Sequence, residues 1–341
     1  MAFPWANTLL LVFIGAEMVS GVFGLLTGSH DWAIYMQAHR VAGFAILAIL
    51  LWKARNVTGS LRWRRSLAPR AASIVLAVTL IATLGLGLTW SFAGRFSFLW
   101  FSGVSWHIYA GVVLAPILLW HSRHHTRGFP VSFWAERRSF LRLAGAVVVG
   151  FAAWRVGETA ASLGRLAGAD RRFTGSYEAD SMSGNAFPVV SWLNDRPPRL
   201  DATEVRLTVT GAVERDVRLS YDDLVADAEL TATIDCTGGW YSIQEWRGVS
   251  VARLLEQARP TNGAASVTFT STTGYYRRFS MDEARGYLLA THVGGQRLSH
   301  GHGFPLRLVA PGKRGFEWVK WVRRLEVNET SKWWQPPLPL R

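Results

Sequence analysis

The chain of 341 residues contains one cysteine, Cys236, in the segment "TIDCTGGWYS" over 233–242. A disulfide needs two cysteines, so this thiol has no partner for one within the chain. A free cysteine is often a small buried hydrophobic side chain. As a thiolate, however, it is a soft ligand for a transition metal. The surroundings of Cys236 in the sequence must decide between these two roles.

Two histidines at matching positions form a second candidate site. The segments "HRVAGFAILAILLWKAR" (39–55) and "HIYAGVVLAPILLWHSR" (107–123) share eight of 17 positions, including His, Gly, Trp and Arg. This match predicts a duplicated helical hairpin in which His39 and His107 lie at one depth and face each other. Opposed imidazoles are the axial pair of a low-spin b-type haem. The alternative is two interfacial histidines bonded to water or backbone carbonyls.

The number of haems depends on His121, which lies 14 residues after His107 and close to the same helix face. The matching position in the first segment is Lys53, so we predict one haem b, near the outer surface, and keep a two-haem conduit as an alternative. Gly43 and Gly111, each four residues after a paired histidine, are expected to leave room for a flat ring.

These histidines lie in the apolar half of the chain, where five segments have the length of a membrane span. Hydrophobic residues make up 49% of the sequence, which also contains 17 tryptophans, too apolar a composition for one ordinary soluble domain. The five segments predict five transmembrane helices, at 8–27, 33–52, 72–90, 103–121 and 140–157.

The charge distribution gives these helices a direction. Before residue 170 there are 15 Lys/Arg against 4 Asp/Glu (net +11), and from residue 170 on there are 22 against 20 (net +2). The basic residues concentrate in the loops 53–71 and 122–139, which places these loops and the N-terminus in the cytoplasm and everything after the fifth helix outside. Because the polar half carries no basic, aromatic-rich face, we predict no nucleic-acid partner.

The entry to the fifth helix, "ERRSFLRLAGAVVVGFAA" (136–153), resembles a twin-arginine export signal in its Arg137-Arg138 pair followed by Phe140-Leu141. That export machinery carries folded proteins, which implies a cofactor inserted in the cytoplasm. The alternative is that these arginines are only the basic anchors that any such helix has.

The exported half begins with a polar stretch rich in Gly, Ser and Ala, which predicts a linker. Short β-type runs then follow, at 204–213, 265–272, 304–311 and 323–327, with one clear helix at 249–258. This pattern predicts a mixed α+β domain. The predicted domains are a four-helix cytochrome b-like bundle (1–130), a fifth helix (131–160), a linker (161–184) and an extracytoplasmic domain (185–341).

The sequence from 185 to 330 resembles the sulfite oxidase-type molybdopterin family. The resemblance rests on Cys236 before a glycine-containing turn and on Trp246-x-Gly-Val before a short helix. It also rests on His302-Gly-x-Pro-x-Arg307, Pro311-Gly312 and Val319-Lys320-Trp321. It implies that Cys236 is the thiolate ligand of molybdenum in a Mo-molybdopterin cofactor, which answers the question that the single thiol raises.

The resemblance also implies which residues hold the pterin and its phosphate. The matching positions are Asn185, Pro188, Val189, Ser271, His302, Arg307, Trp318, Val319 and Lys320. A terminal phosphate needs cationic groups and backbone donors, which Arg307 and Lys320 could supply in part. Tyr275 matches a tyrosine near the family's substrate site, with the adjacent Tyr276 as the alternative.

The chain departs from sulfite oxidases after the cysteine, where Gly238-Gly239-Trp240-Tyr241 replaces Gly-Asn-Arg. The chain also ends soon after "RRLEV" (323–327), without an immunoglobulin-like domain. Both features are more similar to the bacterial periplasmic protein-methionine-sulfoxide reductase subunit, which works with a separate haem membrane partner.

Together these observations predict a multi-domain membrane protein, an all-α transmembrane bundle followed by a mixed α+β molybdopterin domain, in the bacterial cytoplasmic membrane. Its expected function is oxygen-atom transfer on an external small-molecule or protein-bound oxide, with electrons exchanged through haem b with quinone. The direction of electron flow stays open. The alternative is a membrane cytochrome b whose outer domain has lost molybdenum and serves as a binding module.

Overall fold

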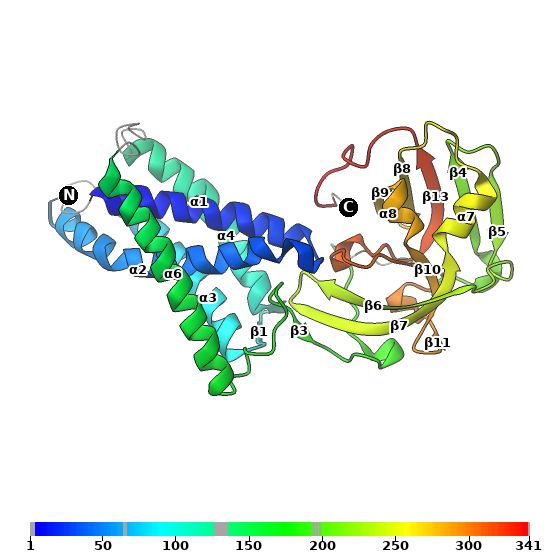
Figure 1. The fold of residues 1–341 in the computed structure, drawn as a ribbon, viewed down its shortest axis with the longest axis horizontal. Coiled ribbons are helices and arrows are strands. Elements are labelled where there is room, and N and C mark those ends of the chain that lie inside the picture. The colour runs from blue at the N-terminus through cyan, green and yellow to red at the C-terminus, as the bar shows by residue number, and fades with distance from the viewer. Residues whose placement is uncertain are drawn as a thin grey trace. The chain divides into compact units, whose positions relative to one another are not determined.

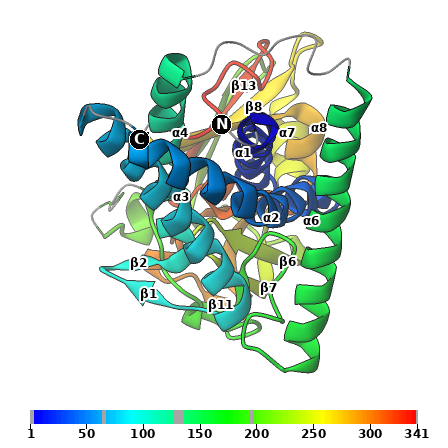
Figure 2. The same cartoon turned by 90° about the vertical axis from the view of Figure 1, so that its left-hand side faces the viewer.

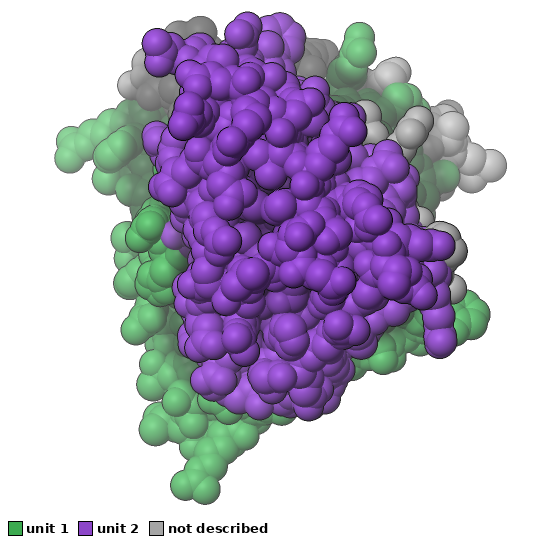
Figure 3. All heavy atoms as spheres, turned by 90° about the vertical axis from the view of Figure 1, so that its right-hand side faces the viewer, with its two compact units in different colours: residues 1–25, 30–177 green, residues 26–29, 178–341 purple. Residues whose placement is uncertain are grey.

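The computed structural model describes residues 4–63, 67–125, 136–192, 195, 197 and 199–339. The chain forms two compact units, one of residues 1–25 and 30–177 and the other of residues 26–29 and 178–341 (Figure 3). Three arginines of the two predicted cytoplasmic loops, Arg64, Arg65 and Arg127, lie outside the described residues.

The first unit is helical (Figure 1). Its long helices are α1 (Pro4–Leu26), α2 (Ala33–Trp63), α3 (Leu67–Ala93), α4 (Gly103–His125) and α6 (Arg137–Leu163). Five stretches are long and apolar enough to cross a membrane, at Trp5–Leu26, His30–Arg55, Ala71–Ala93, Gly103–Arg123 and Arg137–Leu163, and the second begins in the 3-10 helix η1 (His30–Trp32) that precedes α2. The five expected helices are therefore present, while their orientation in a membrane remains a prediction.

Within this unit α3 packs along α4, and α2 packs along α6 (Figures 1 and 2). The core between the helices is aliphatic and includes Leu9, Ile46 and Leu114. The α2–α6 crossing is close, because a Cβ atom on Gly150 of α6 would lie 2.4 Å from the carbonyl oxygen of Val41 in α2. Small residues at such crossings let two helix backbones approach each other.

The segment after α6 also belongs to the first unit. The sequence predicts a linker over 161–184, whereas α6 continues to Leu163 and the unit extends to residue 177. Arg171 donates to the carbonyl oxygens of Ser91 and Gly168, and the Trp90 indole donates to the Gly175 carbonyl at 2.8 Å. These hydrogen bonds hold the segment after α6 against the helices, although its Gly/Ser/Ala content alone predicts a flexible linker.

The second unit contains two β-sheets, and the first of them holds Cys236. Its centre is the long antiparallel hairpin of β6 (Ala228–Cys236) and β7 (Trp240–Ser250). Strand β10 (Leu288–Val293) pairs with β7, and it also pairs with β11 (Gln296–Arg297) and β12 (Arg307–Val309). The chain enters this unit through β3 (Tyr177–Glu178).

The second sheet has the order β5 (Val217–Ser220), β4 (Arg206–Gly211), β13 (Val322–Asn328), β8 (Ser266–Ser271), β9 (Tyr276–Ser280). Only β4 and β13 among these neighbours run parallel. Helices α7 (Val251–Ala258) and α8 (Met281–Arg285) pack with the sheets around one core that contains Trp246, Phe269 and Leu289. The expectation of a mixed α+β domain is thus confirmed.

Three short 3-10 helices complete the surroundings of the site. They are η2 (Gly184–Ala186), η5 (His300–His302) and η6 (Gly315–Glu317). The expected strand at 304–311 is shorter than predicted and covers only Arg307–Val309, because Pro305 has no backbone N–H for a strand ladder. A further 3-10 helix, η4 (Ala202–Glu204), precedes β4.

Candidate active site

Cys236 ends strand β6 at the turn into β7, where it is the register partner of Trp240. Its side chain is buried, and the amide of Gly238 donates to the thiol sulfur at 3.3 Å. Burial raises the pKa of the Cys236 thiol, while the Gly238 amide and the charge of Arg314 act in the opposite direction. A thiol in such surroundings becomes a thiolate readily only when it gains a cation such as a metal ion.

A buried ion pair fixes the backbone at Cys236. Arg314 Nη1 lies 2.7 Å from Asp235 Oδ1, and Arg314 Nη2 donates to the Cys236 carbonyl at 3.3 Å. Both charged side chains are almost fully buried. The backbone of Gly315 packs against that of Cys236, since a Cβ atom added at Gly315 would lie 3.2 Å from Cys236 Cα. The sequence analysis did not identify Asp235 or Arg314, although an acid directly before the cysteine was a signal.

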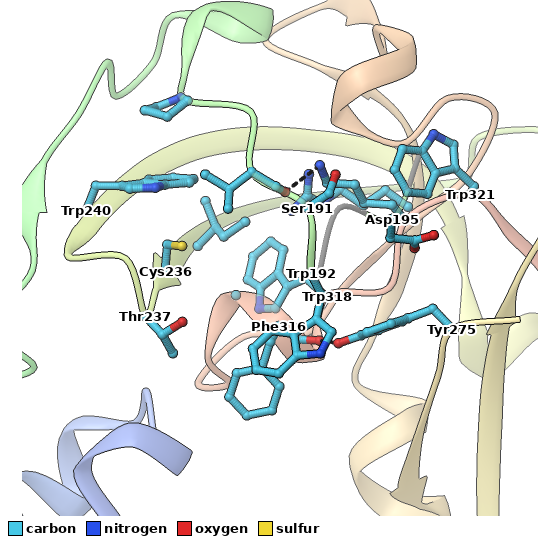
Figure 4. Close-up of a pocket in the computed structure, with 16 residues that line it drawn as sticks. Ser191, Trp192, Asp195, Cys236, Thr237, Trp240, Tyr275, Phe316, Trp318 and Trp321 are labelled. Carbon is cyan, nitrogen blue, oxygen red and sulfur yellow. Dashed lines mark hydrogen bonds between the residues drawn. The ribbon is translucent and has the colours of Figure 1, made fainter. Parts of the chain in front are cut away.

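The Cys236 side chain lines a pocket rich in aromatic rings (Figure 4). Trp240 and Thr237 lie beside the cysteine, and Tyr275 and Trp321 lie across the pocket from it. The lining consists of Pro188, Val190, Ser191, Trp192, Asp195, Ile234, Cys236, Thr237, Trp240, Tyr275, Arg307, Gly315, Phe316, Trp318, Lys320 and Trp321.

Arg307 brings a buried positive charge to this pocket. Its Nη1 donates to the His302 carbonyl at 2.9 Å, and its guanidinium carbon lies 5.6 Å from the Trp246 ring centroid and 5.9 Å from that of Trp318. The Nε atom is buried and has no hydrogen-bond partner among the described residues. Burial lowers the pKa of Arg307 to about 9.

Lys320 is the second cation of the pocket. Its Nζ atom donates to the carbonyl oxygens of Val190 at 2.8 Å and Gly301 at 2.7 Å. Burial, followed by the neighbouring charge of Arg307, lowers the pKa of Lys320 to about 7. Within the described part of the chain, neither Lys320 nor Arg307 forms an ion pair with a carboxylate. A compensating charge comes from the Asp195 carboxylate, which also lines the pocket and acts to raise the pKa of Lys320 without forming an ion pair with it.

His302 lies next to Arg307, whose guanidinium donates to its carbonyl oxygen. Its Nδ1 lies 2.7 Å from Ser299 Oγ and its Nε2 lies 2.8 Å from the Phe187 carbonyl, so both ring nitrogens bond within the protein. Burial lowers the pKa of His302 to about 4, which keeps the ring neutral near pH 7. Asn185 binds the same loop, because its Oδ1 accepts from the Ser299 amide at 2.9 Å.

The structure brings most of the expected site residues together, but not all of them line the pocket. Cys236, Pro188, Tyr275, Arg307, Trp318 and Lys320 do. The other expected residues do not line it. Ser271 bonds to Thr273, Val319 is fully buried, and Val189 is 54% exposed. His302 and Asn185 instead form hydrogen bonds that hold the loop next to Arg307. Tyr275 faces the pocket and donates to the Phe316 carbonyl, whereas Tyr276 is exposed on β9. The sequence analysis missed Trp192 and Phe316, and it named Trp321 only within the motif Val319-Lys320-Trp321; Phe316 and Trp321 both lie between β12 and β13.

Comparisons with known proteins agree with this geometry. Residues 194–334 match the family model described as "Oxidoreductase molybdopterin binding domain". The chain is 31% identical over 160 residues to nitrate reductase [NADH] of Spinacia oleracea, covering 36% of this chain and 17% of that protein. It is 28% identical over 160 residues to nitrate reductase [NADPH] of Fusarium oxysporum, covering 38% and 18%.

Among solved structures, the sulfane dehydrogenase SoxCD from Paracoccus pantotrophus matches 39% of this chain and 40% of its own chain, at 28% identity and a TM-score of 0.38. The chain spans less than a fifth of the length of the nitrate reductases that it matches. Residues 194–334 of the second unit are thus similar to oxidoreductase molybdopterin-binding domains.

The residues present fit a molybdopterin cofactor. The group carries a dithiolene and a phosphate, which are anionic, and the pocket supplies the buried Arg307 and the partly buried Lys320, neither of which forms an ion pair with a described carboxylate. The Trp240 indole N–H is a further buried donor with no partner among the described residues. A single buried thiol at the pocket wall is a suitable soft ligand for the metal.

In the first unit, the structure places the two expected histidines side by side. The ring centroids of His39 (α2) and His107 (α4) lie 5.9 Å apart, and the ring planes are 89° apart. The Nδ1 of His107 bonds to the Thr83 carbonyl at 2.8 Å, and the Nδ1 of His39 lies 3.1 Å from the Glu17 carbonyl. Metal-binding histidines usually donate their other ring N–H to such an acceptor.

The two imidazoles are close neighbours, and each has its Nδ1 bonded to a backbone carbonyl of an adjacent helix. The expected space beside the paired glycines differs between the two hairpins. A Cβ atom on Gly111 would meet nothing within 4 Å, whereas one on Gly43 would lie 3.0 Å from Glu17 Oε1. Gly43 therefore makes room for a carboxylate, which the sequence analysis missed.

Proposed function

We propose that this protein is a membrane-anchored molybdenum oxidoreductase that transfers an oxygen atom to or from an external substrate and exchanges electrons through haem b with the quinone pool. The observation that carries the proposal is the buried thiol of Cys236 in an aromatic pocket that also holds two cations, Arg307 and Lys320. This pocket lies in the unit that matches the molybdopterin-binding domain.

The molybdenum cofactor would supply two-electron oxygen-atom transfer. Cys236 would hold the metal, and Arg307 and Lys320 would neutralise the anionic groups of the pterin. The Arg314–Asp235 pair fixes the backbone that presents the thiol. Tyr275 places a phenol on the opposite wall, where burial raises its pKa and keeps it protonated. It can therefore position a substrate oxygen but is a poor base.

The substrate is an oxide or its reduced form. Reduction of an oxide consumes two electrons and two protons and releases water, and oxidation takes the oxygen atom from water and returns the electrons. The names of the similar nitrate reductases support the reductive direction. The aromatic lining supports a neutral oxide such as a sulfoxide, small or protein-bound, as in the methionine-sulfoxide reductase that the sequence resembles.

The haem would connect the two-electron site to the membrane, because it moves electrons singly between quinone and molybdenum. The support for it is the facing pair His39 and His107, each with its Nδ1 held by a backbone carbonyl. The exposed Arg137 and Arg138 at the start of α6 support the twin-arginine export of a folded, cofactor-loaded domain. The lipid bilayer, quinone and the export machinery are the partners that this proposal requires.

The test uses the full chain purified in detergent with its haem reduced by dithionite. Adding a panel of sulfoxides and amine oxides should reoxidise the haem in the wild type, and the Cys236→Ser variant should lose this reaction by on the order of a thousandfold or more. Thr237→Ser, a change on the neighbouring pocket residue, is the matched control and should keep it. Equal rates in Cys236→Ser and wild type would reject the molybdenum role.

The second candidate function is a cytochrome b whose outer domain has lost molybdenum and binds a partner. It is favoured only by the internal hydrogen bonds of His302, which leave neither of its ring nitrogens free for a cofactor. Purified wild-type protein that contains haem but no molybdenum would establish this alternative.

A further inference from the structure

The two histidines lie in matching environments that the sequence duplication does not reveal. A Cβ atom on Gly21 of α1 would lie 3.3 Å from His39 Cε1, and one on Gly87 of α3 would lie 3.0 Å from His107 Cε1. In each case the carbonyl four residues before that glycine, from Glu17 or Thr83, bonds to the histidine Nδ1. The neighbouring helices α1 and α3 thus repeat the same arrangement.

The side chains at these two matching positions differ. Glu17 Oε2 lies 2.6 Å from His39 Nδ1, closer than the backbone carbonyl of the same residue. Thr83 turns its hydroxyl away from His107 and donates it to the Thr79 carbonyl at 2.8 Å. Among the described residues, a carboxylate therefore contacts His39 but not His107.

The site accommodates the Glu17 carboxylate closely. Its Oε1 atom is buried and has no hydrogen-bond partner among the described residues, and Gly43 supplies the space for it. An acidic side chain inside a membrane-spanning segment is costly and is usually retained for function. Packing alone would be served as well by an apolar side chain of similar size.

We propose that Glu17 is a positioning residue that fixes the orientation of His39 and, through its negative charge, lowers the reduction potential of the haem. This inference rests on the proposed function, since it requires haem between His39 and His107. A carboxylate on the far ring nitrogen raises the basicity of a metal-binding imidazole. A negative charge in low-dielectric surroundings favours the more positive, oxidised state of the centre.

The experiment is a spectroscopic redox titration of the haem in the full chain, purified in detergent, without any substrate. Glu17→Gln should keep the haem and raise its midpoint potential, so that the ratio of ferrous to ferric haem at a fixed ambient potential increases on the order of tenfold. Thr83→Ala changes the matching side chain but leaves the carbonyl that binds His107, and it should leave the potential unchanged. Haem-loaded Glu17→Gln with the wild-type potential would overturn the proposal, as would an equal rise in Thr83→Ala.

A second variant keeps the inference testable if Glu17→Gln fails to bind haem. Gly43→Ala retains Glu17 but forces Oε1 to move, because the added Cβ would lie 3.0 Å from it. It should raise the potential, whereas Gly15→Ala, which meets nothing within 4 Å, should not. Identical potentials in the two alanine variants would reject the role of Glu17. Absence of haem from the wild type would instead reject the proposed function.

Discussion

Lys320 and Arg307 lie in a pocket where they contact carbonyl oxygens and aromatic faces, and neither forms an ion pair with a described carboxylate, although Asp195 also lines the pocket. Burial of an unpaired cation is unfavourable, so such a pocket is prepared for an anion. The proposed molybdopterin cofactor is such an anion, and residues 194–334 match the family model for its binding domain. The cofactor-free protein should therefore be destabilised by this site, and the free energy of unfolding should depend on pH.

The pH dependence follows from Lys320, whose pKa falls from 10.5 to about 7 in the folded chain. Between these two values the unfolded chain binds more protons than the folded one, so the unfolding free energy should increase as pH rises from about 7 towards 10. Thermal melting of cofactor-free protein across this range should show the increase, and Lys320→Met should reduce it. Parallel melting curves for the two proteins would contradict the assignment.

At the scale of elements, the β6–β7 hairpin determines where the thiol lies. The buried face of β7 includes the polar residues Ser242 and Gln244, both hydrogen-bonded to the Asp180 carbonyl. This face is therefore only partly apolar, which is why alternation of hydrophobic residues did not reveal the strand. Strands β4, β8 and β13, which carry the apolar alternation, were predicted within about two residues.

The buried ion pair on this hairpin should be essential for its stability. Replacing Asp235 with Ala leaves Arg314 buried without its partner, which should cost about 3 to 5 kcal/mol of unfolding free energy. Glu229→Ala is the matched control on the same strand, because the Glu229–Arg247 pair is largely exposed and should contribute under about 1 kcal/mol. Chemical denaturation of both variants measures the difference, and equal losses would show that the Arg314 pair is unimportant.

At the scale of the whole molecule, the sequence predicts the two halves because composition and charge differ between them. The five helices and the resemblance around Cys236 could be inferred from local patterns. Residues that meet only through the fold could not be inferred in this way, such as Trp192 and Phe316 in the pocket. Glu17 could have been singled out from the sequence, since it is an acidic residue inside a predicted span and such residues usually have a polar partner, here His39.

Export of the second unit provides a prediction at this scale. Replacing Arg137 and Arg138 together with lysine keeps the positive charge that orients a helix but removes the twin-arginine signal. Protease added to spheroplasts should digest a tag on the C-terminus of the wild type, and it should spare the tag in the double variant. Full digestion in both proteins would show that the arginines act only as basic anchors.

The most direct test of the central assignment is the metal and haem content of the purified full chain. Wild-type protein should contain molybdenum and haem b in equal amounts, close to one of each per chain. Cys236→Ser should lose the molybdenum and keep the haem. Wild-type protein free of both groups, or full molybdenum occupancy in Cys236→Ser, would contradict the assignment of Cys236 as the metal ligand of a haem-linked oxidoreductase.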